Sequence, residues 1–270
     1  MTILIRGGGD LASGVALRLR HAGMPVVITE LSNPLAVRRA VAFSEAIRAG
    51  TVTVEGQVGT LLSWAGDTAA IRLALEAGHI PVLIDPDART IGRLHPVAVV
   101  DARLLKQPVA RPADSVELLV GLGPGFTPGV NCDAAVETAR GPWLGRVYWD
   151  QPASADTGQP DPVMAQTGTR VLRAPASGVL TSHVEIGMVV DAGQLVAEVD
   201  GQALHAAFRG AVRGLLPSGM PVTAGLKIGD LDPRGDTRLC YQVSDKALAL
   251  GGGVLEALLT QPAGRARLWD

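Results

Sequence analysis

The chain has 270 residues, of which 47% are hydrophobic and 3% aromatic, and its formal net charge is −2. This length is enough for one large domain or two ordinary ones, and the apolar content excludes an intrinsically disordered chain. The small net charge and the lack of a long basic run disfavour a nucleic-acid partner, because such proteins neutralise phosphates with Lys and Arg.

The sequence does not indicate a targeting segment or a metal site. Met1 leads directly into a strand-like pattern, without the basic leader and apolar core of a signal peptide. No apolar run reaches the roughly 18 residues of a transmembrane helix. Cys132 and Cys240 are too few for a disulfide framework and lack the spacing of metal ligands. We therefore expect a cytoplasmic protein with no membrane association and no bound metal.

The first half of the chain alternates strand-like and helix-like segments. Short β-branched runs predict strands at residues 3–6, 25–29, 51–54, 81–84, 97–100 and 116–120. Helical periodicity follows the first strand, and further helices are expected at residues 34–48 and 67–77. This alternation predicts an α/β fold, with a Rossmann-like parallel sheet that carries helices on both faces.

The first predicted strand leads into a glycine-rich turn that fits a dinucleotide fingerprint, Gly7-Gly8-Gly9-x-x-Ala12. Gly7 would allow the tight turn, Gly9 would let phosphate oxygens approach the backbone, and Ala12 would let the helix pack on the strand. The helix start would then offer unpaired N–H groups to an anion. The alternative interpretation is that these glycines only make a tight turn.

Two acidic residues accompany this turn. Glu30 ends the second predicted strand, where a carboxylate accepts hydrogen bonds from ribose hydroxyls. Asp10 adds a negative charge beside the turn, which disfavours a phosphate there, and it is alternatively the N-cap of the helix. Both are candidate ligand-binding residues.

A second glycine-rich loop follows the strand predicted at residues 116–120 and is expected to face the first turn across a crevice. Its prolines would stiffen it, and its glycines would keep backbone amides accessible. The candidate ligand contacts in this loop are Gly123, Pro124, Gly125, Phe126 and Thr127. Cys132 follows and is either a reactive thiolate or, as is commoner for cysteine, a small buried hydrophobe.

The second half contains an internal repeat with an offset of 32 residues and no gap. Identical residues occupy matching places in the two copies: Ala174, Gly178, Gly187, Met188, Val190, Ala192 and Gly193 in the first, and Ala206, Gly210, Gly219, Met220, Val222, Ala224 and Gly225 in the second. Each copy has the pattern of short strands separated by glycine turns. This pattern resembles the biotinyl/lipoyl barrel-sandwich fold, which is an all-β domain.

In biotinyl and lipoyl domains the modified lysine lies on the hairpin that joins the two halves. The matching stretch here, from Asp200 to His205, has no lysine, and Lys227 lies deep in the second copy. We therefore expect no lipoyl or biotin cofactor, and a structural, docking or ligand-covering role for this module. His183 and His205 are expected to be structural, because no further ligand is spaced to complete a metal site with them.

The last segment predicts a helix with Ser244 as N-cap, near residues 245–259, which contains Gly251-Gly252-Gly253. Each glycine inside a helix costs roughly 1 kcal/mol relative to alanine. The helix is therefore expected either to pack its glycine face tightly, preferably on the first domain, or to break there. The expected domains are residues 1–168 (Rossmann-like), 169–236 (barrel) and 237–270 (packing back on the first domain).

Several short segments together resemble one protein family. They are Arg6-Gly7-Gly8-Gly9-Asp10-Leu11-Ala12-Ser13-Gly14, Thr29-Glu30-Leu31, Gly123-Pro124-Gly125-Phe126, Val136-Glu137-Thr138, Arg173-Ala174-Pro175 and Gly229-Asp230-Leu231-Asp232-Pro233-Arg234. Their order and spacing are similar to those of the maturation proteins of the selenium-dependent molybdenum hydroxylase system. The resemblance covers nearly the whole chain, and its specificity lies in the combination of segments.

The resemblance implies an accessory role, akin to a chaperone, in the assembly of xanthine dehydrogenase-like molybdenum hydroxylases. The cargo would be a pterin dinucleotide, such as molybdopterin cytosine dinucleotide, and the partner the apo-hydroxylase. Gly7, Gly8 and Gly9 would hold its diphosphate and Glu30 a ribose, while Arg6 and Arg173 would supply charge-assisted hydrogen bonds.

Two other functions share the same crevice. An NAD(P)-dependent oxidoreductase would need a proton-transfer group near the hydride site, and neither His79 nor His95 lies in a recognisable catalytic motif. An interaction scaffold would need no small ligand at all. The sequence therefore leaves open whether the chain is an enzyme.

Overall fold

The computed structural model describes residues 2–62, 67–114, 116–156, 158, 163–164 and 168–261. The chain forms two compact units, the first of Met1–Pro34, Ala42–Thr157 and Val243–Asp270, and the second of Leu35–Val41 and Gly158–Gln242. Leu35–Val41 thus belongs to the second unit, and the segment expected as 237–270 is divided between the units at residue 243. Of that segment, residues 262–270 lie outside the described residues.

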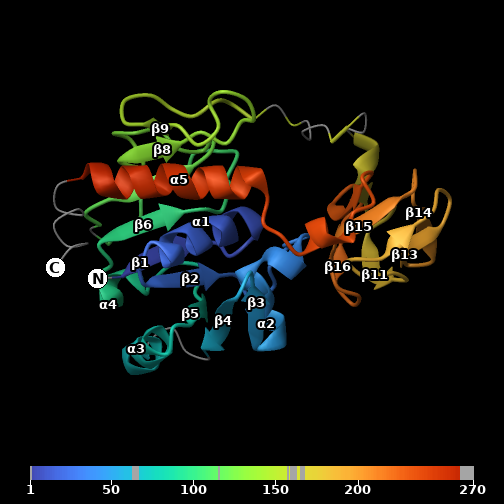
Figure 1. Cartoon of the computed structure of the whole chain (residues 1–270), viewed down its shortest axis with the longest axis horizontal. Helices are drawn as coiled ribbons and strands as arrows, with labels where there is room; N and C mark the ends of the chain where they lie inside the picture. Colours follow the sequence, from blue (N-terminus) through green and yellow to red (C-terminus); the bar gives the residue numbers. More distant parts are fainter. Residues whose placement is uncertain are drawn as a thin grey trace. The chain divides into compact units, whose positions relative to one another are not determined.

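The first unit is an α/β structure built on a nine-stranded mixed sheet with the order β3-β4-β5-β2-β1-β6-β7-β8-β9 (Figure 1). Adjacent strands from β4 to β8 in this order are parallel, whereas β3 and β9 add antiparallel edges. The strands are β1 (Ile3–Arg6), β2 (Val26–Glu30), β3 (Thr51–Val54), β4 (Gln57–Leu62), β5 (Ile80–Ile84), β6 (Ala98–Asp101), β7 (Leu119–Leu122), β8 (Ala134–Val136) and β9 (Val147–Tyr148).

The strands expected in the first half are all present, but the sheet is larger than the sequence predicted. The segment at residues 51–54 does not join the parallel array, because it forms a hairpin with β4. Glu55 and Gly56 in the turn both have positive φ, 45° and 82°, which matches the right-handed twist of a tight hairpin. Strands β4, β8 and β9 were not predicted.

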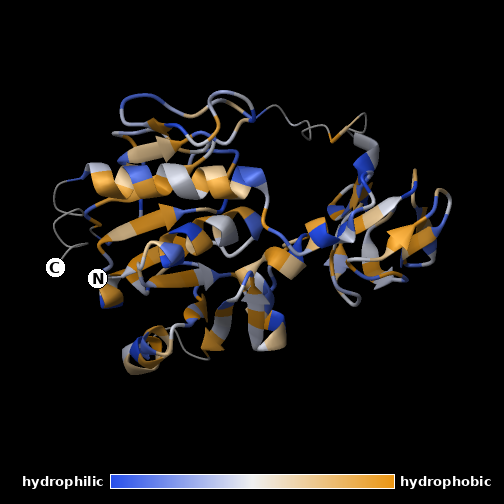
Figure 2. Cartoon of the chain, viewed as in Figure 1, coloured by the Kyte–Doolittle hydropathy of each residue, from blue (hydrophilic) through white to orange (hydrophobic). Residues whose placement is uncertain are grey.

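Helices cover both faces of the sheet. Helices α1 (Asp10–His21) and α5 (Asp245–Thr260) lie side by side over one face (Figure 1). On the other face, Ile71 of α3 (Thr68–Glu76) packs on Val27, and Ile91 of α4 (Ile91–Leu94) packs on Leu4. Leu4 and Val27 are register partners, so α3 and α4 share that face. Strands β1, β2 and β6 between these layers are strongly apolar (Figure 2).

The helix predicted at residues 34–48 is wrong. This segment contains two 3₁₀ turns, η1 (Arg39–Val41) and η2 (Phe43–Glu45), and one short helix, α2 (Ala46–Ala49). Backbone bonds to distant strands and turns replace the helical pattern: the Leu215 amide donates to the Val37 carbonyl at 2.9 Å, and the Ser44 amide donates to the Gly8 carbonyl at 2.8 Å. Tertiary contacts therefore determine the conformation of residues 34–48 in place of their local helical propensity.

Helix α5 runs unbroken through its three glycines. The Ser244 hydroxyl oxygen accepts the Ala247 amide at 3.1 Å and caps the helix, as predicted. A Cβ on Gly253 would overlap the carbonyl oxygen of Gly145, and a Cβ on Gly14 of α1 would overlap Ala247. Gly14 and Gly253 are needed because other parts of the chain pass within contact distance of their backbone. The expected tight packing on the first domain is present.

The second unit consists of two four-stranded antiparallel sheets, with the orders β10-β17-β15-β12 and β14-β13-β11-β16. Two 3₁₀ turns, η3 (Gly168–Arg170) and η4 (Thr237–Cys240), flank them. The strands are β10 (Val171–Arg173), β11 (Gly178–Ser182), β12 (Val189–Val190), β13 (Leu195–Val199), β14 (Gln202–His205), β15 (Gly210–Leu215), β16 (Pro221–Val222) and β17 (Lys227–Asp232).

The 32-residue repeat becomes an internal two-fold relation in this unit. A shift by one repeat converts the strand order of one sheet into that of the other. Backbone bonds follow the same rule: the Ala174 amide donates to the Leu226 carbonyl, and the Ala206 amide donates to the Gln194 carbonyl, both at 2.9 Å. Each sheet also pairs strands of the two copies with one another, β12 with β15 in one sheet and β11 with β16 in the other.

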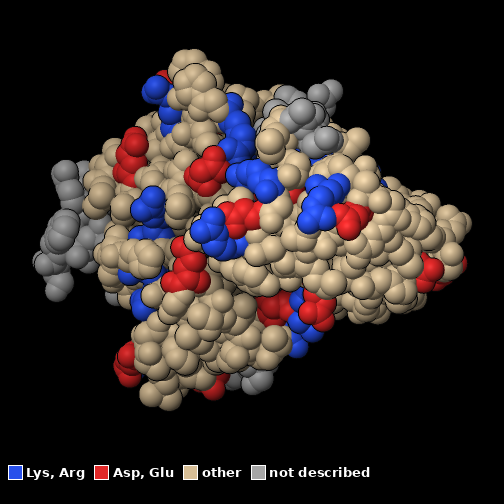
Figure 3. All heavy atoms as spheres, turned by 45° about the vertical axis from the view of Figure 1, so that its right-hand side comes forward, with Lys and Arg blue, Asp and Glu red and all other residues tan. Residues whose placement is uncertain are grey.

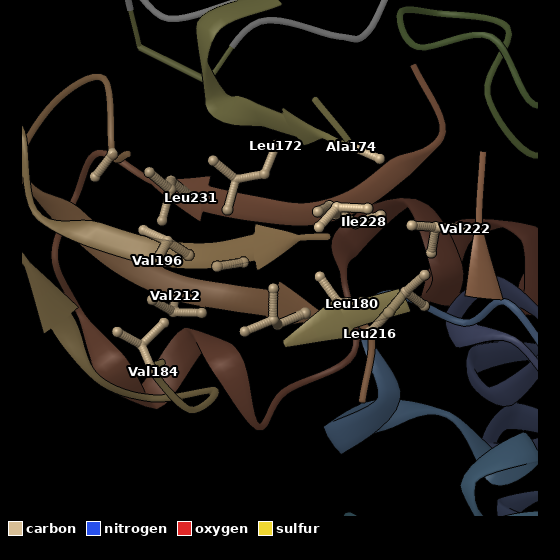
Figure 4. Packing of buried hydrophobic residues seen from close by; sticks show 14 of the residues in the cluster. Leu172, Ala174, Leu180, Val184, Val196, Val212, Leu216, Val222, Ile228 and Leu231 are labelled. Carbon is tan, nitrogen blue, oxygen red and sulfur yellow. The ribbon is translucent and has the colours of Figure 1, made fainter. Parts of the chain in front are cut away.

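The core of the second unit is built from aliphatic side chains that the repeat preserves. Leu180 and its counterpart Val212 are fully buried, as are Val196 and its counterpart Ile228. Their side chains meet between the two sheets (Figure 4). Matching positions in the two copies thus contribute to a single core.

Membrane-spanning helices do not occur in the part of the chain that the structure describes, since no helix there has the length and apolarity to cross a bilayer.

The packing of α5 gives the first testable expectation. Gly252 is exposed, with no atom near the position of a Cβ, whereas Gly253 faces the Gly145 carbonyl. We expect Gly252→Ala to stabilise the protein by up to about 1 kcal/mol, because alanine favours the helix. Gly253→Ala should instead destabilise it by roughly 1–3 kcal/mol through overpacking. Urea unfolding of both variants measures the two effects, and equal effects would contradict the packing described.

Candidate functional site

The candidate site lies where the strand order of the large sheet reverses. Strand β1 has β2 on one side and β6 on the other, and all three run parallel. In open α/β sheets, ligands bind beyond the carboxyl ends of the strands at such a reversal. The turn Gly7–Gly9 follows β1 at this place and leads into α1. The predicted position of the glycine fingerprint, between a strand and a helix, is therefore confirmed.

The three glycines of this turn have different roles. Gly7 has φ of +91°, and a Cβ there would lie 3.3 Å from the Ala102 carbonyl oxygen, so the turn itself requires glycine. Gly9 has an ordinary φ of −66°, and no atom lies within 4 Å of the position of its Cβ. Neither the backbone conformation nor the packing at position 9 therefore explains why this residue is glycine.

Gly9, not Asp10, is the N-cap of α1, and it provides no side-chain cap. The cap proposed for Asp10 is therefore wrong, and Asp10 lies in the first turn of the helix. Ala12 is buried, as its packing role requires. The start of α1 therefore has no side-chain cap at Gly9, and it has open space there.

Glu30 binds the turn directly. One carboxylate oxygen accepts the Gly8 amide at 2.7 Å, and the other accepts the Leu31 amide at 2.7 Å. The Gly7 amide donates to the Thr29 carbonyl at 2.8 Å. Two of the three glycine amides expected to hold phosphate are thus used inside the protein. A phosphate that binds at this turn is therefore left with Gly9 and the start of α1 as its contacts, because the amides of Gly7 and Gly8 are already used.

Two serines that the sequence analysis did not assign to the site form hydrogen bonds with the turn. The Ser13 hydroxyl donates to the Gly9 carbonyl at 2.9 Å and accepts the Phe43 amide at 2.8 Å. The Ser44 amide bonds the Gly8 carbonyl, and the buried Ser44 hydroxyl has no hydrogen-bond partner within the described ranges. The only sequence clue was the position of Ser13 one helical turn after Gly9.

A trio of charged residues lies at the same reversal. Asp101, which ends β6, is 1% exposed and accepts Arg6 Nη1 at 3.3 Å. Arg103 Nε and Nη2 donate to the two Asp101 oxygens at 2.8 and 2.6 Å. Burial lowers the pKa of Arg6, and the charge of Asp101 acts in the opposite direction. Asp101 and Arg103 were missed, although a charged pair directly after a predicted strand was visible in the sequence.

The second glycine-rich loop is closed rather than open to a ligand. A Cβ on Gly125 would lie 2.6 Å from the Leu105 carbonyl oxygen, and Phe126 is buried against Gly121. The Gly123 amide donates to Val136 at 3.1 Å, and the Thr127 amide donates to the Asn131 side chain at 2.8 Å.

The expectation that the glycines of this loop keep their amides accessible is therefore wrong at Gly123, because an internal hydrogen bond uses that amide, as another uses the amide of Thr127. Pro124, which has no amide hydrogen, is half-buried. The loop forms a rigid wall after β7.

Two other candidate groups are structural. Cys132 is fully buried, and burial raises the pKa of its thiol to about 12, so the reactive-thiolate alternative is wrong. Glu137 is also buried, and its two oxygens accept the Ala139 and Ser154 amides, each at 2.7 Å. Glu137 therefore fixes the loop that follows β8.

The hairpin that joins the two halves of the second unit carries no lysine. The turn between β13 and β14 is Asp200-Gly201, with positive φ at both residues, as expected of a tight hairpin without a modified side chain. His183 Nε2 pairs with Glu198 at 2.8 Å. Among the residues that the structure describes, no three His, Cys, Asp or Glu side chains are grouped to hold a metal ion.

The charged side chains form no broad patch of one sign on the face shown in Figure 3, where many basic groups lie beside acidic ones. Ion pairs of the described chain include Arg209 with Asp191 and Arg238 with Asp236. That face lacks the continuous basic surface on which nucleic-acid binding depends.

Comparison with known proteins places the chain beside an uncharacterised relative. It is 46% identical over 257 residues to a protein named "Uncharacterized protein YqeB" from Escherichia coli (strain K12). The match covers 95% of this chain and 47% of the relative, so the chain spans about half the length of the curated relative it matches. No family model matches.

A solved structure with partial likeness is an aspartoacylase family protein from Mesorhizobium loti, with 11% identity over 85% of this chain and 84% of that one. Its TM-score is 0.28, which is too low to support an argument about fold or function.

The contacts of Glu137 give a pH-dependent expectation. Burial acts to raise the pKa of Glu137, but hydrogen bonds from backbone amides lower it below its ordinary value. A carboxylate with a depressed folded-state pKa stabilises the protein above its unfolded pKa, and this stability is lost as the pH falls through the folded value. Glu137→Gln should therefore lower the free energy of unfolding by roughly 1–3 kcal/mol at pH 7.

The difference between Glu137→Gln and wild type should shrink below about pH 4, where the wild-type carboxylate becomes protonated. Glu256→Gln, at an exposed position of α5, is the control and should show little change at either pH. Urea unfolding at both pH values measures this. A difference that is constant with pH would show that the charge of Glu137 is irrelevant.

Proposed function

We propose that this chain is an accessory factor in the maturation of molybdenum hydroxylases, and that its first unit binds the dinucleotide part of a pterin cofactor such as molybdopterin cytosine dinucleotide. Under this proposal the first unit is Rossmann-like, the second is a barrel-sandwich module without a carrier group, and the protein works in the cytoplasm. The partner is an apo-hydroxylase, with or without selenium. The proposal combines the sequence resemblance with the geometry at the reversal of the sheet.

The observation that carries the ligand proposal is the open, uncapped start of α1 at Gly9. Nothing occupies the space where a Cβ would lie, although the backbone there tolerates any residue. Diphosphate oxygens approaching Gly9 would meet the backbone N–H groups of the first turn of α1 and the positive end of its dipole. A turn that served only to reverse the chain would not require glycine at this position.

The other residues of the site are compatible with a dinucleotide. Each Glu30 oxygen accepts one backbone amide and keeps a further lone pair that can accept a ribose hydroxyl. The closed loop after β7 would act as a wall of the site rather than as a clamp on the ligand.

The second unit is proposed to cover the cofactor or to dock on the hydroxylase. Its hairpin between β13 and β14 carries Asp200 and Gly201 and no lysine, which supports a role without lipoyl or biotin.

A direct test is native mass spectrometry of the protein purified from a host that makes the pterin dinucleotide. Retention of that cofactor supports the proposal. Micromolar binding of NADH, followed by fluorescence, would instead favour an oxidoreductase. Co-purification with a hydroxylase in the absence of any bound nucleotide would favour a scaffold.

Substitution of Gly9 separates a phosphate site from a simple turn. Gly9→Ala has room for its Cβ, so it should lower stability by no more than about 1 kcal/mol, the usual size of an N-cap effect. The methyl group should nevertheless obstruct phosphate approach and weaken binding of dicytidine diphosphate at least about tenfold, equal to 1.4 kcal/mol. Isothermal titration calorimetry and thermal melting give the two readouts.

Two glycine variants serve as controls for Gly9→Ala. Gly252→Ala, at an exposed position of α5, should bind like the wild type. Gly8→Ala should strain the fold, because its Cβ would lie 3.0 Å from the Ser44 nitrogen and 3.1 Å from an Ile28 methyl group. Wild-type affinity in Gly9→Ala would refute the phosphate site.

A further inference from the structure

Arg103 is a basic residue that lies beside the turn after β1. A Cβ built on Gly7 would lie 3.4 Å from Arg103 Cγ, so the stem of this side chain passes beside the turn. The backbone continues the parallel ladder here, since the Ala102 amide donates to the Arg6 carbonyl at 2.9 Å. Arg103 therefore stands at the β1–β6 reversal, where a ligand of the sheet is expected.

The guanidinium of Arg103 is held in one orientation. Its Nε and Nη2 donate to the two oxygens of Asp101, which is itself buried. Within the described residues, Nη1 of Arg103 makes no hydrogen bond or ion pair. The Arg103 side chain is 30% exposed. A guanidinium fixed by a buried carboxylate and still partly open to solvent loses little freedom when it binds an anion.

Asp101 does not need Arg103 for charge compensation. Its Oδ2 already accepts Arg6 Nη1 at 3.3 Å, and Arg6 is itself buried. One carboxylate shared between two guanidinium groups leaves the trio with one net positive charge. Asp85 and Asp87 add negative charge near Arg6, so the positive group of the trio that is left to contact an anion is the partly exposed guanidinium of Arg103.

Carboxylates at the same edge limit how much negative charge the site accepts. Glu30 binds the turn, and the Asp85 amide donates to the Glu30 carbonyl, which places Asp85 at the next strand end. A diphosphate diester carries one negative charge on each phosphate, whereas a nucleoside triphosphate carries more. The balance of charges therefore favours the diester.

We propose, on the basis of the function proposed above, that Arg103 binds a phosphate oxygen of a diphosphate diester through Nη1, with Asp101 as its positioning residue. Arg103 thereby selects dinucleotide-type ligands over nucleoside triphosphates. A purely structural Arg103 would only shield Asp101 from water.

The test compares Arg103 with an arginine of the same local geometry. Arg238 also donates Nε and Nη2 to an aspartate two residues earlier, at 2.9 and 2.7 Å, but it lies in the second unit and is largely exposed. The variants are Arg103→Met, Arg103→Lys and the control Arg238→Met. Calorimetry with dicytidine diphosphate and with CTP gives the affinities, and thermal melting confirms folding.

We expect Arg103→Met to bind dicytidine diphosphate at least about tenfold more weakly than the wild type, as for loss of a charge-assisted hydrogen bond. Arg103→Lys keeps the charge beside Asp101 but not the planar fork, so it should be intermediate, and it remains informative if the Met variant does not fold. Arg238→Met should match the wild type. The wild type should prefer dicytidine diphosphate to CTP.

Wild-type affinity in both Arg103 variants, with binding still weakened by Gly9→Ala, would overturn the role of Arg103 and leave the proposed function standing. Tighter binding of CTP than of dicytidine diphosphate would overturn the ligand class. Failure of the wild-type protein to bind either compound would overturn both this inference and the phosphate site.

Discussion

The hydrogen bond between the Gly8 amide and the Glu30 carboxylate is the constraint on which the candidate site depends. It joins the turn after β1 to the end of β2, and Ser44 holds the same residue from the other side through the Gly8 carbonyl. With Gly8 fixed and Gly7 in a left-handed conformation, Gly9 is presented as the uncapped start of α1. The hydrogen bonds that fix Gly8 therefore hold the turn rigid and also keep Gly9 at the open start of the helix.

The same contacts reduce the number of backbone amides that the glycine fingerprint can offer to a ligand. A turn whose amides were all free could surround a phosphate, but here two amides are satisfied internally and one edge of the turn is left open. Under the proposed function, binding requires additional donors, and Arg103, held by Asp101 at the neighbouring strand end, would supply one. The proposed site would be shared between a helix start and a preorganised guanidinium, rather than enclosed by one loop.

Close backbone approach recurs as the reason for glycine elsewhere in the chain. Helices α1 and α5 pack through Gly14 and Gly253, and the second unit brings Gly214 against Val37. These contacts tie residues near the two ends of the described chain into the first unit, and a segment from the first half of the chain into the second unit. Small side chains thus set the arrangement within each unit, while aliphatic residues fill the cores.

The sequence by itself determined the α/β class, most strands of the large sheet, the cap at Ser244 and the repeat, because periodicity, capping and glycine turns are local properties. Only the tertiary structure decided that residues 34–48 form no long helix, that Gly8 is bound by Glu30, and that Cys132 is buried. Arg103 likewise gained its place from the pairing of β6 with β1. These features depend on partners far away in the chain, and no local pattern encodes which distant group will take a given amide or charge.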